Sequence, residues 1–482
     1  MHTLKDLLKG IIKVNDKTGA IKINNIETDS TKVCSGDLFV ALKGVKTDGH
    51  KYIESAVKNG AAAILCEDKI NSGVPVIYVE NTRNALSLIC ANYYSNPADN
   101  LAFAGITGTN GKTSVAYFTH YIFSKCGRKS GLMGTVENFN GDKWQVSEYT
   151  TPDPVKMQKL LHEMLENGCN HCVMEVSSHA LSQERTAGIN FTVGAFTNFT
   201  RDHIDDYHLT MENYLNEKLK LMKSSDNSVI NIDDKNAESF IKSSRGNALT
   251  YGINNSADIT AFDIINTEKG SEFSFSYKEK TYKTGVNVRG LFSVYNALCA
   301  LGISIVMGIK PSAAADAMRT APSVKGRMES VDINEKYSVI LDYAHTPDAL
   351  ENVLKTIRNL ESKGKLTVLF GCGGDKDREK RPLMGKIASE FSDNIIITTD
   401  NPRTEEPAKI IDDILAGIKN TKTPYTAIEN RKDAIEHALK NAKEGDVLLF
   451  AGKGHEDYQI IGKQKIHFDE REIITLISNK KL

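Results

Sequence analysis

The sequence carries almost no net charge and lacks long apolar segments. Its 60 lysines and arginines and 61 aspartates and glutamates give a formal charge of −1 at pH 7, so no overall basic field attracts nucleic acid. No apolar run approaches the ~20 residues of a membrane-spanning helix. The first six residues lack the apolar core of a secretory signal. We therefore expect a cytoplasmic protein that binds no nucleic acid and has no membrane span.

Cysteines are few and scattered. The chain has eight, and only Cys169 and Cys172 have the spacing of a redox or zinc pair. No second pair of this kind occurs, and apolar Val173, Met174 and Val176 follow directly. We therefore expect reduced cysteines beside a buried strand. Internal repeats and low-complexity segments are absent as well.

Length and composition indicate a globular protein of several domains. A chain of 482 residues corresponds to about three domains of the usual size. Its 40% hydrophobic and 25% charged residues are ordinary for such proteins. Turn-forming residues gather at 94–100 and at 322–326, where we place the boundaries. The expected domains are 1–97, 98–322 and 323–482.

Short apolar runs alternate with helical patterns along most of the chain, which predicts an α/β fold with parallel sheets. Residues 250–285 differ, because their apolar side chains alternate with a period of two, which indicates antiparallel strands added to the central sheet. The expected strands of the parallel sheets are Leu38–Leu42, Ala61–Leu65, Cys172–Val176, Val193–Thr197, Val229–Ile232, Val339–Asp342, Leu366–Phe370, Asn394–Thr398 and Val447–Ala451.

The most informative segment is a glycine-rich loop at residues 105–114, Gly-Ile-Thr-Gly-Thr-Asn-Gly-Lys-Thr-Ser. It lies between an apolar run and a helical pattern, which is the setting of a phosphate-binding loop. Backbone N–H groups and the helix dipole would hold a polyphosphate. Lys112 would reach its β- and γ-phosphates, and the Thr113 hydroxyl would hold Mg²⁺. The usual pattern has glycine where this chain has Ile106, and the alternative is a glycine-rich turn with a solvated lysine.

Two further strand ends carry polar groups. Glu175 ends an apolar strand, and its position suits a hard cation that prefers oxygen ligands at the carboxyl edge of a sheet; the alternative is a surface glutamate. Residues 201–208 hold seven ionisable side chains just past the next strand. Among them His203 is a candidate metal ligand and His208 a structural residue, while the alternative is a solvated charged loop.

Five segments of the chain stand in a recognisable order: residues 105–114, 175–180, 197–203, 326–329 and 342–347. In content and order they resemble the motifs of the Mur ligase family, and they span nearly the whole chain. Thr-Thr-Pro-Asp at 150–153 and Asp-Asn-Pro-Arg at 400–403 resemble, more narrowly, the members that add the third amino acid of the peptide.

The resemblance implies three domains: an N-terminal α/β domain for the UDP moiety, a central phosphate-loop ATPase and a C-terminal Rossmann-like domain for the incoming amino acid. It implies that ATP phosphorylates the terminal carboxylate of UDP-MurNAc-L-Ala-D-Glu in peptidoglycan synthesis. An amine then replaces the phosphate to form an amide, while Lys112 and Mg²⁺ would neutralise charge on the phosphoryl group. The implied cofactors are ATP and Mg²⁺, the partners are small-molecule substrates and the expected state is a monomer.

Roles carry over to individual positions through the same resemblance. The implied catalytic residues are Lys112, Glu175, His203 and Lys218. The implied ATP-binding residues are Gly108, Thr109, Asn110, Gly111, Lys112, Thr113, Ser114, Asn296, Arg327 and Asp342. The implied metal ligands are Thr113, Glu175, His203 and Lys218, the last as a carbamate, since adding CO₂ turns an ammonium into an anion. The implied contacts to the UDP-MurNAc-dipeptide are Ser30, Thr150, Thr151, Ser177, Gln183 and Arg185. The residues alone would make Lys218 a solvated helix lysine.

The resemblance also predicts that the added amino acid is meso-diaminopimelate. Its second head group carries a carboxylate that Arg403 can bind with two parallel hydrogen bonds, whereas lysine has none there. Lys376 stands where diaminopimelate-adding members usually have arginine, so it keeps the positive charge but lacks the paired N–H donors of a guanidinium. The alternative is therefore the same ligation with L-lysine. The predicted diaminopimelate contacts are Lys376, Asp400, Asn401, Pro402, Arg403, Gly452 and Glu456, of which Glu456 suits an ammonium group.

Two other classes of function remain as alternatives. A P-loop kinase or switch ATPase would form ADP without an amide product, and the motif at 150–153 and the extensive third domain argue against it. A nucleotide-binding regulator without catalysis is the other, and it is disfavoured by the intact Lys112, Glu175, His203 and Lys218.

Overall fold

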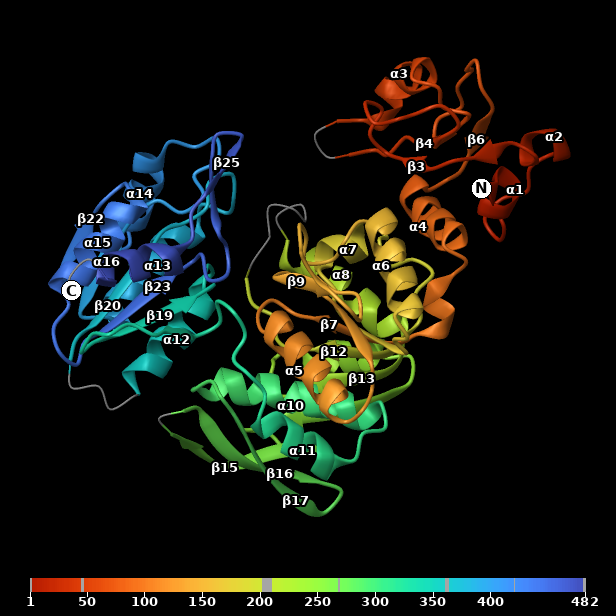
Figure 1. The fold of residues 1–482 in the computed structure, drawn as a ribbon. Coiled ribbons are helices and arrows are strands. Elements are labelled where there is room, and N and C mark those ends of the chain that lie inside the picture. The colour runs from red at the N-terminus through yellow and green to blue at the C-terminus, as the bar shows by residue number, and fades with distance from the viewer. Residues whose placement is uncertain are drawn as a thin grey trace.

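The computed structural model describes residues 2–44, 47–201, 210–267, 269–359, 364–419 and 421–479. The chain forms three α/β domains, each around its own sheet. In Figure 1 the N-terminal domain, in red, and the C-terminal domain, in blue, lie on different sides of the central domain. None of the helices in the described part of the chain has the length and apolar content that a membrane crossing requires.

The N-terminal domain is built on a four-stranded parallel sheet of order β3-β4-β5-β6. Strands β4 and β5 confirm the two strands predicted in this region, and both are completely buried. The elements are β1 His2–Thr3, α1 Leu4–Leu7, α2 Asp16–Gly19, β2 Lys22–Ile23, β3 Ile26–Glu27, β4 Leu38–Val40, η1 Gly49–Tyr52, α3 Ile53–Lys58, β5 Ala63–Cys66, β6 Val76–Tyr78, α4 Thr82–Tyr93 and η2 Pro97–Asn100.

The central domain contains an 11-stranded sheet of order β10-β9-β8-β11-β7-β12-β13-β14-β15-β16-β17. Strands from β8 to β15 run parallel, while β15, β16 and β17 form the antiparallel extension that the period-two pattern predicted. Strand β14 ends within this patterned region but pairs parallel to β13.

The phosphate-binding loop lies between β7 and α5, in the middle of the sheet. The elements are β7 Ala102–Thr107, α5 Lys112–Lys125, β8 Ser130–Met133, β9 Glu137–Phe139, β10 Trp144–Val146, α6 Pro154–Glu166, β11 His171–Glu175, α7 Ser178–Ser182, β12 Phe191–Phe196, α8 Met211–Lys223, β13 Ser225–Asn231, α9 Ala237–Ser243, β14 Asn247–Gly252, β15 Ile259–Asn266, β16 Ser271–Tyr277, β17 Lys280–Val286, α10 Leu291–Val306 and α11 Pro311–Arg319.

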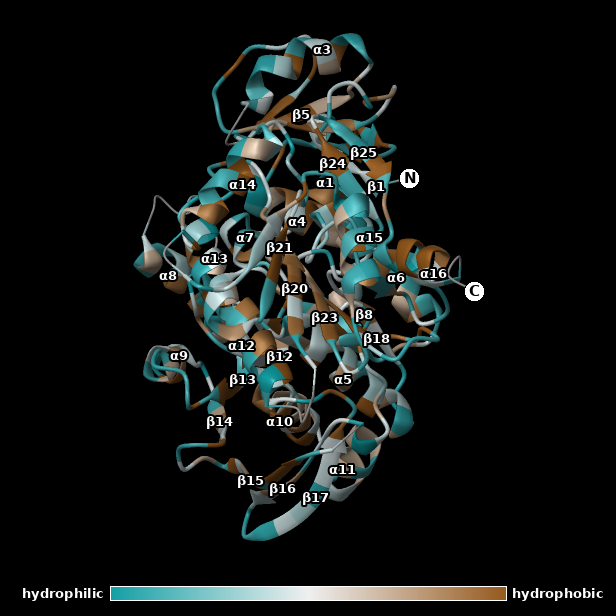
Figure 2. Ribbon diagram, turned by 90° about the vertical axis from the view of Figure 1, so that its left-hand side faces the viewer, coloured by the Kyte–Doolittle hydropathy of each residue, from teal (hydrophilic) through white to brown (hydrophobic). Residues whose placement is uncertain are grey.

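The C-terminal domain has a six-stranded sheet of order β18-β19-β23-β20-β21-β22, parallel except for β18. Figure 2 shows the hydrophobic colouring of the central strands β20, β21 and β23 between mixed helices. The elements are β18 Glu329–Val331, β19 Ser338–Asp342, α12 Pro347–Arg358, β20 Leu366–Phe370, α13 Lys380–Phe391, β21 Asn394–Ile397, α14 Pro407–Leu415, β22 Tyr425–Ala427, α15 Arg431–Asn441, β23 Val447–Ala451, β24 Tyr458–Ile461, β25 Gln464–His467 and α16 Glu470–Asn479.

The segment that enters the C-terminal domain is held closely against it. A Cβ added at Gly326 would lie 2.2 Å from the backbone nitrogen of His455, and Gly326 has φ +69°, so a side chain does not fit there. Arg471 binds Glu329 through two nitrogens, with Nε 2.8 Å from Oε1, and also donates to the Gly454 carbonyl at 2.9 Å. These contacts fix the start of β18 on the C-terminal domain.

Candidate functional site

Two glycines shape the phosphate-binding loop. Gly108 has φ +148° and Gly111 has φ +86°, which are backbone conformations that side chains disfavour. A Cβ at Gly108 would lie 1.9 Å from Thr197 Oγ1, and one at Gly111 would lie 2.3 Å from Asn296 Oδ1. The glycine spacing of the loop therefore matches its neighbours in this fold. It also brings Asn296, a predicted ATP contact, against the N-terminus of α5.

Two lysines converge on this loop from different helices. Lys112 Nζ donates to the carbonyl oxygens of Gly108 at 3.0 Å and Thr109 at 2.8 Å. Lys218 Nζ, from α8, donates to the same Gly108 oxygen at 2.8 Å and lies 4.5 Å from the centre of the Tyr214 ring. Lys218 is 1% exposed. It is therefore a buried group beside the loop, whereas the residues alone indicated a solvated lysine.

Glu175 accepts hydrogen bonds from two hydroxyls beside the loop. Its Oε2 lies 3.0 Å from Thr113 Oγ1 and 3.0 Å from Thr135 Oγ1, and its Oε1 accepts the Thr135 N–H at 2.8 Å. Thr150 Oγ1 lies within hydrogen-bonding distance of the Thr135 hydroxyl, at 3.1 Å. This set offers only oxygen atoms, which suits Mg²⁺. Sequence analysis missed Thr135, although its place just past the carboxyl end of β8, at the edge where Glu175 ends β11, was a usable signal.

A cavity of about 600 Å³ lies between the phosphate-binding loop and the C-terminal domain, within the usual range for small-molecule sites. It brings together every predicted ATP-binding residue except Gly108, with Thr150 and Glu175. The predicted residues among its lining are Thr109, Asn110, Gly111, Lys112, Thr113, Ser114, Thr150, Glu175, Asn296, Arg327 and Asp342.

Arg327 and Asp342 bring the C-terminal side to this cavity. Arg327 Nη2 donates to Thr113 Oγ1 at 3.0 Å, while its buried Nε has no hydrogen-bond partner among the described residues. Asp342 accepts the N–H groups of Met328 and Ala344, each at 2.7 Å. Burial raises the pKa of the Asp342 carboxyl, and the Arg327 charge opposes that rise. The unpartnered Arg327 nitrogen suits an anionic ligand such as a phosphate.

The predicted dipeptide contacts of the central domain form one cluster. Thr151 Oγ1 accepts the Ser177 N–H at 3.0 Å and donates to the Glu175 carbonyl at 2.8 Å. Arg185 donates to the Thr151 carbonyl at 2.8 Å and to Gln183 Oε1 at 2.7 Å. The cluster is therefore joined to the backbone of Glu175 through Thr151.

Ser30 lies apart from this cluster, in the N-terminal domain. It is 7% exposed, and its carbonyl accepts a hydrogen bond from Asn59 at 2.8 Å. The charges of Lys32, from the N-terminal domain, and Lys465, from the C-terminal domain, both act to lower the pKa of Glu148 in the central domain. The first cause of its lowered pKa is the hydrogen bond from Lys156.

Residues 400–403, just past the end of β21, are fixed by a hairpin that we call the clamp hairpin, β24–β25. Arg403 has φ +51°, a left-handed conformation that is uncommon for residues other than glycine. Its N–H donates to the Ile460 carbonyl at 3.1 Å, and its carbonyl accepts the Gly462 N–H at 2.7 Å. The side chain donates from Nη1 to the Gly374 carbonyl at 2.9 Å. The clamp hairpin therefore holds the backbone that carries the guanidinium.

A buried arginine ties the two loops of this region together. Arg381 is 0% exposed and makes a two-nitrogen ion pair with Glu405 at 2.8 and 2.9 Å. It also contacts Asp413 at 2.9 Å, and Glu405 Oε1 accepts the Asp375 N–H at 2.6 Å. The ion pair thus links the loop of Asp375 to the segment that follows Arg403. Its position within the charged run at 378–381 gave no sign that Arg381 is buried.

The other predicted amino-acid contacts lie around the same strand ends. Glu456 Oε2 accepts a hydrogen bond from Asn401 Nδ2 at 2.9 Å. Gly452 has φ +107°, and a Cβ there would lie 3.0 Å from Asp400 Oδ2, a buried oxygen without a hydrogen-bond partner among the described residues. Lys376 is exposed and makes no hydrogen bond or ion pair with another described residue, so its ammonium is available to a ligand.

Comparison with known proteins decides the family. Three family descriptions match successive segments: "Mur ligase family, catalytic domain" at 22–94, "Mur ligase middle domain" at 106–304 and "Mur ligase, glutamate ligase domain" at 326–454. A relative from Clostridium botulinum named UDP-N-acetylmuramoyl-L-alanyl-D-glutamate–2,6-diaminopimelate ligase is 46% identical over 478 residues, covering 98% of this chain and 97% of its own. The chain belongs to the Mur ligase family.

Further relatives agree with this family. A protein of the same name from Clostridium tetani is 44% identical over 480 residues, covering 98% of both chains. A solved structure with that name has a TM-score of 0.70 and 30% identity and covers 99% of both chains. A solved MurF ligase from Thermotoga maritima in complex with ADP has 17% identity and a TM-score of 0.65, covers 96% of this chain and 98% of its own, and is similar in fold alone.

One predicted site residue of this Mur ligase cannot be placed. His203, predicted as a catalytic residue and metal ligand, lies outside the described residues, as does His208. The eight cysteines are free, and Cys169 and Cys172 are buried, as the cysteine pattern predicted.

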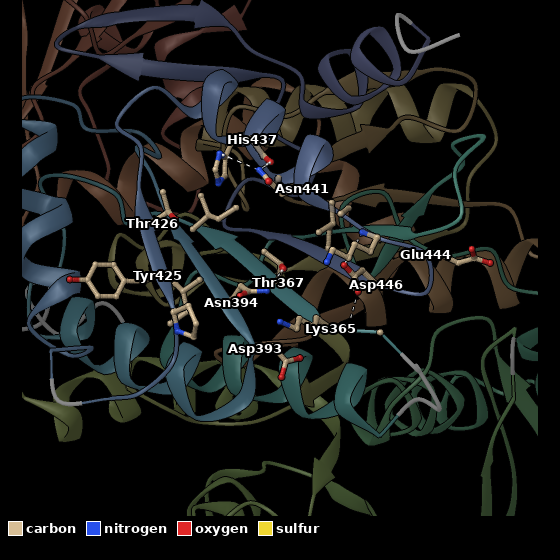
Figure 3. A pocket seen from close by; sticks show the side chains of 18 of the residues that line it. Lys365, Thr367, Asp393, Asn394, Tyr425, Thr426, His437, Asn441, Glu444 and Asp446 are labelled. Atoms are coloured by element: carbon tan, nitrogen blue, oxygen red, sulfur yellow. Dashed lines mark hydrogen bonds between the residues drawn. The ribbon is translucent and has the colours of Figure 1, made fainter.

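A second cavity of about 630 Å³ lies at the opposite edge of the C-terminal sheet, beside Lys365, Asn394 and Tyr425 at the amino ends of the strands (Figure 3). Ligands of open α/β sheets bind at the carboxyl ends. Asp446, which borders this cavity, accepts backbone N–H groups of Lys365 and Lys443 at 2.7 and 2.9 Å. Its polar groups therefore serve the fold, and we do not assign it to the reaction.

Proposed function

We propose that this Mur ligase uses ATP to join meso-diaminopimelate to the terminal carboxylate of UDP-N-acetylmuramoyl-L-alanyl-D-glutamate. The observation that carries the proposal is the cavity of about 600 Å³, which joins the phosphate-binding loop to Arg327 and Asp342. The amino-acid pocket around Arg403 belongs to the same C-terminal domain. The names of the relatives agree with this activity.

The reaction would proceed in two steps. A carboxylate is a poor electrophile, so the γ-phosphoryl group of ATP is first transferred to a carboxylate oxygen, which gives ADP and an acyl-phosphate. The amine of the incoming amino acid then attacks the acyl carbon, phosphate leaves with the C–O bond electrons, and the nitrogen loses a proton. Lys112 and Arg327 would bind the phosphoryl oxygens as negative charge shifts during transfer.

The residues around Glu175 fit a magnesium ion. Thr113 and Glu175 would hold it through oxygen atoms, as the donor set predicts, and His203 remains a proposed ligand. Bound Mg²⁺ would neutralise phosphate charge. We also propose that Lys218 carries a carbamate. Its burial beside Gly108 supports a role at the site, because lysine side chains are almost never fully buried unless their charge is paired.

Recognition of diaminopimelate would rest on Arg403. Its side chain is half-buried, with one Nη used by the Gly374 carbonyl, and the remaining N–H groups can bind the distal carboxylate. Lys376 can add a single charged contact, and Glu456 can accept from an ammonium. Ligation of L-lysine remains the alternative, because Lys376 lacks the fork of an arginine.

The broader organisation is proposed with the function. We propose boundaries near 97 and 322, since the family matches end at 94 and 304 and begin again at 106 and 326. A monomer would suffice, because one chain supplies all the residues named above. A cytoplasmic location would follow from the use of ATP.

The test is an amino-acid competition assay. Purified enzyme receives UDP-MurNAc-L-Ala-D-Glu, ATP and Mg²⁺ with either diaminopimelate or L-lysine, and phosphate release and product mass are measured. We expect phosphate release and an amide-linked product with diaminopimelate only. Release with L-lysine alone would overturn the specificity, and ADP without any amide product would favour a kinase or switch ATPase.

A further inference from the structure

Lys453 is a buried lysine within the proposed amino-acid pocket. It follows β23 and Gly452, and its side chain is 0% exposed. Its Nζ lies 2.9 Å from Glu456 Oε2 and 3.2 Å from Asn401 Oδ1. The Tyr458 ring, whose centre is 5.7 Å from Nζ, lies beside it. A lysine is almost never fully buried unless it is paired, so this ammonium belongs to the arrangement of the pocket.

Lys453 and Asn401 use the same oxygen of Glu456. Asn401 Nδ2 also donates to Glu456 Oε2, at 2.9 Å. Asn401 Oδ1 accepts a hydrogen bond from Lys453 Nζ at 3.2 Å and another from the Ile460 N–H at 2.9 Å. Asn401 and Lys453 therefore both reach Oε2, and the Tyr458 side chain adds a hydrogen bond to the same carboxyl group. The glutamate is held in a fixed orientation, and neither Asn401 nor Lys453 uses its Oε1.

The charges around Glu456 come from several elements. Burial raises the pKa of its carboxyl and Asp400 adds to the rise, whereas Lys453 and its hydrogen bond act against it. Burial also acts to raise the pKa of Asp400, but the charges of Lys453 and Arg431 hold that pKa below its usual value. The other titratable groups that interact with these two carboxylates are Tyr343, His345, Cys372 and Tyr458, and Arg403 acts on Tyr458. Lys453 is thus the cation shared by two buried carboxylates.

We propose that Lys453 is a positioning residue that holds Glu456 charged and oriented so that its other oxygen receives the ammonium group of the incoming amino acid. The proposal rests on the proposed function, but only on the part common to diaminopimelate and L-lysine, since both carry ammonium groups. With its side chain enclosed, Lys453 acts through Glu456 and Asn401 and does not touch the substrate.

The charge of Lys453 has a consequence for pH dependence. Without it, Asp400 and Glu456 lose their shared cation, and the protonated form of Glu456 becomes favoured up to a higher pH. A protonated Glu456 cannot pair with an ammonium group. The variant Lys453→Met should therefore bind the amino acid poorly at low pH and recover as pH rises, while a lysine that serves only packing would lower activity equally at all pH values.

The experiment measures kcat/KM for the amino acid between pH 6 and 9, using whichever of diaminopimelate and L-lysine the wild type ligates. For Lys453→Met we expect KM for the amino acid to rise about 10-fold at neutral pH, KM for ATP to stay within about twofold, and the acid limb to move upward by about one pH unit. Lys453→Arg, which keeps the charge, should retain the wild-type limb. Lys443→Met, at an exposed lysine of the same domain, is the matched control.

The outcomes separate the two proposals. A wild type that forms no amide with either amino acid overturns the proposed function, and this proposal with it. An active wild type whose Lys453→Met variant keeps the wild-type acid limb overturns only the role of Lys453. If the methionine variant does not fold, Glu456→Gln decides: loss of the acid limb supports the proposal, and an unchanged limb overturns it.

Discussion

Asn110 Nδ2 donates to Asp348 Oδ2 at 2.9 Å, across the boundary between the phosphate-binding loop and helix α12 of the C-terminal domain. Burial raises the pKa of Asp348, and the Asn110 hydrogen bond opposes the rise. Because this half-buried carboxylate bonds to the phosphate-binding loop, we expect it to couple ATP binding to the position of the third domain.

We expect Asp348→Ala to raise KM for ATP about 5-fold, the usual worth of one hydrogen bond. KM for the UDP-substrate should change less, because the cluster around Thr151 does not involve this bond. Steady-state kinetics with varied ATP concentration measures KM for ATP. Asp316→Ala, at an exposed position of α11, is the control. An unchanged KM for ATP would contradict the coupling.

Thr135 links the proposed metal and substrate residues, because its hydroxyl contacts both Glu175 and Thr150. We expect Thr135→Val to lower kcat about 10-fold through loss of Glu175 alignment, while the backbone N–H bond to Glu175 preserves the fold. The measurement is kcat with saturating substrates over a range of Mg²⁺ concentrations. Thr192→Val, on strand β12 of the same sheet, is the control and should behave as wild type.

Arg403 and Lys376 allow specificity to be tested in both directions. Arg403→Lys should raise KM for diaminopimelate about 30-fold, because a charge-assisted fork is lost, with little effect on KM for ATP. Lys376→Arg should lower KM for diaminopimelate, since it supplies a second fork. Equal effects of Arg403→Lys on diaminopimelate and on L-lysine ligation would argue against recognition of the distal carboxylate.

The ion pair of Glu329 and Arg471 gives a pH-dependent contribution to stability. Burial acts to raise the pKa of Glu329, but the hydrogen bonds from Arg471 and Gly326 hold that pKa below its usual value. The stabilisation is therefore complete above the unfolded pKa of about 4.3 and is lost as pH falls through the lower folded pKa.

Glu329→Gln should then lower the free energy of unfolding by about 2 kcal/mol at pH 7, since the Arg471 charge loses its partner. The difference from wild type should shrink as pH falls below about 4.3. Thermal unfolding midpoints from pH 3.5 to 8 measure it, and Glu444→Gln, at an exposed pair, serves for comparison. A constant difference over this range would rule out the pair as its cause.

Lys218 provides the test of the carbamate. Carbamylation joins the neutral amine to CO₂ and releases a proton, so Lys218→Ala removes a proposed metal ligand. We expect a loss of about 100-fold in kcat, partly restored by added acetate or formate. Lys220→Ala, on the same helix but partly exposed, is the control. Near-normal activity of Lys218→Ala without rescue would remove the proposed role.

Local patterns predicted those parts of the molecule whose signals lie within one segment. The phosphate-binding loop, the strand that ends at Glu175 and the antiparallel strands after β14 each follow from glycine spacing, apolar runs or period-two alternation. The roles of Lys218 and Arg403 came from the resemblance to the family, because a single lysine or arginine in a polar stretch carries no local sign of its partners.

Residues whose partners are distant in the sequence were not predicted. Thr135 meets Glu175, Arg381 meets Glu405, and Lys453 meets Asn401 only when separate strand ends come together. Burial of these side chains depends on tertiary packing, which no pattern of neighbouring residues records. The clamp hairpin was missed for the same reason, since its backbone bonds to Arg403 leave no trace in side-chain type.

The clamp hairpin bears on how a ligase of this kind can be re-engineered. Its backbone groups at Ile460 and Gly462 hold Arg403 in a left-handed conformation, and backbone bonds survive most side-chain substitutions but not a change in loop length. Transplanting residues 400–403 into another scaffold would therefore transfer the side chains without the backbone contacts that orient Arg403. A graft that carries the hairpin along should transfer both. We expect a one-residue insertion near Gly462 to change the choice of amino acid while leaving every proposed contact residue in place.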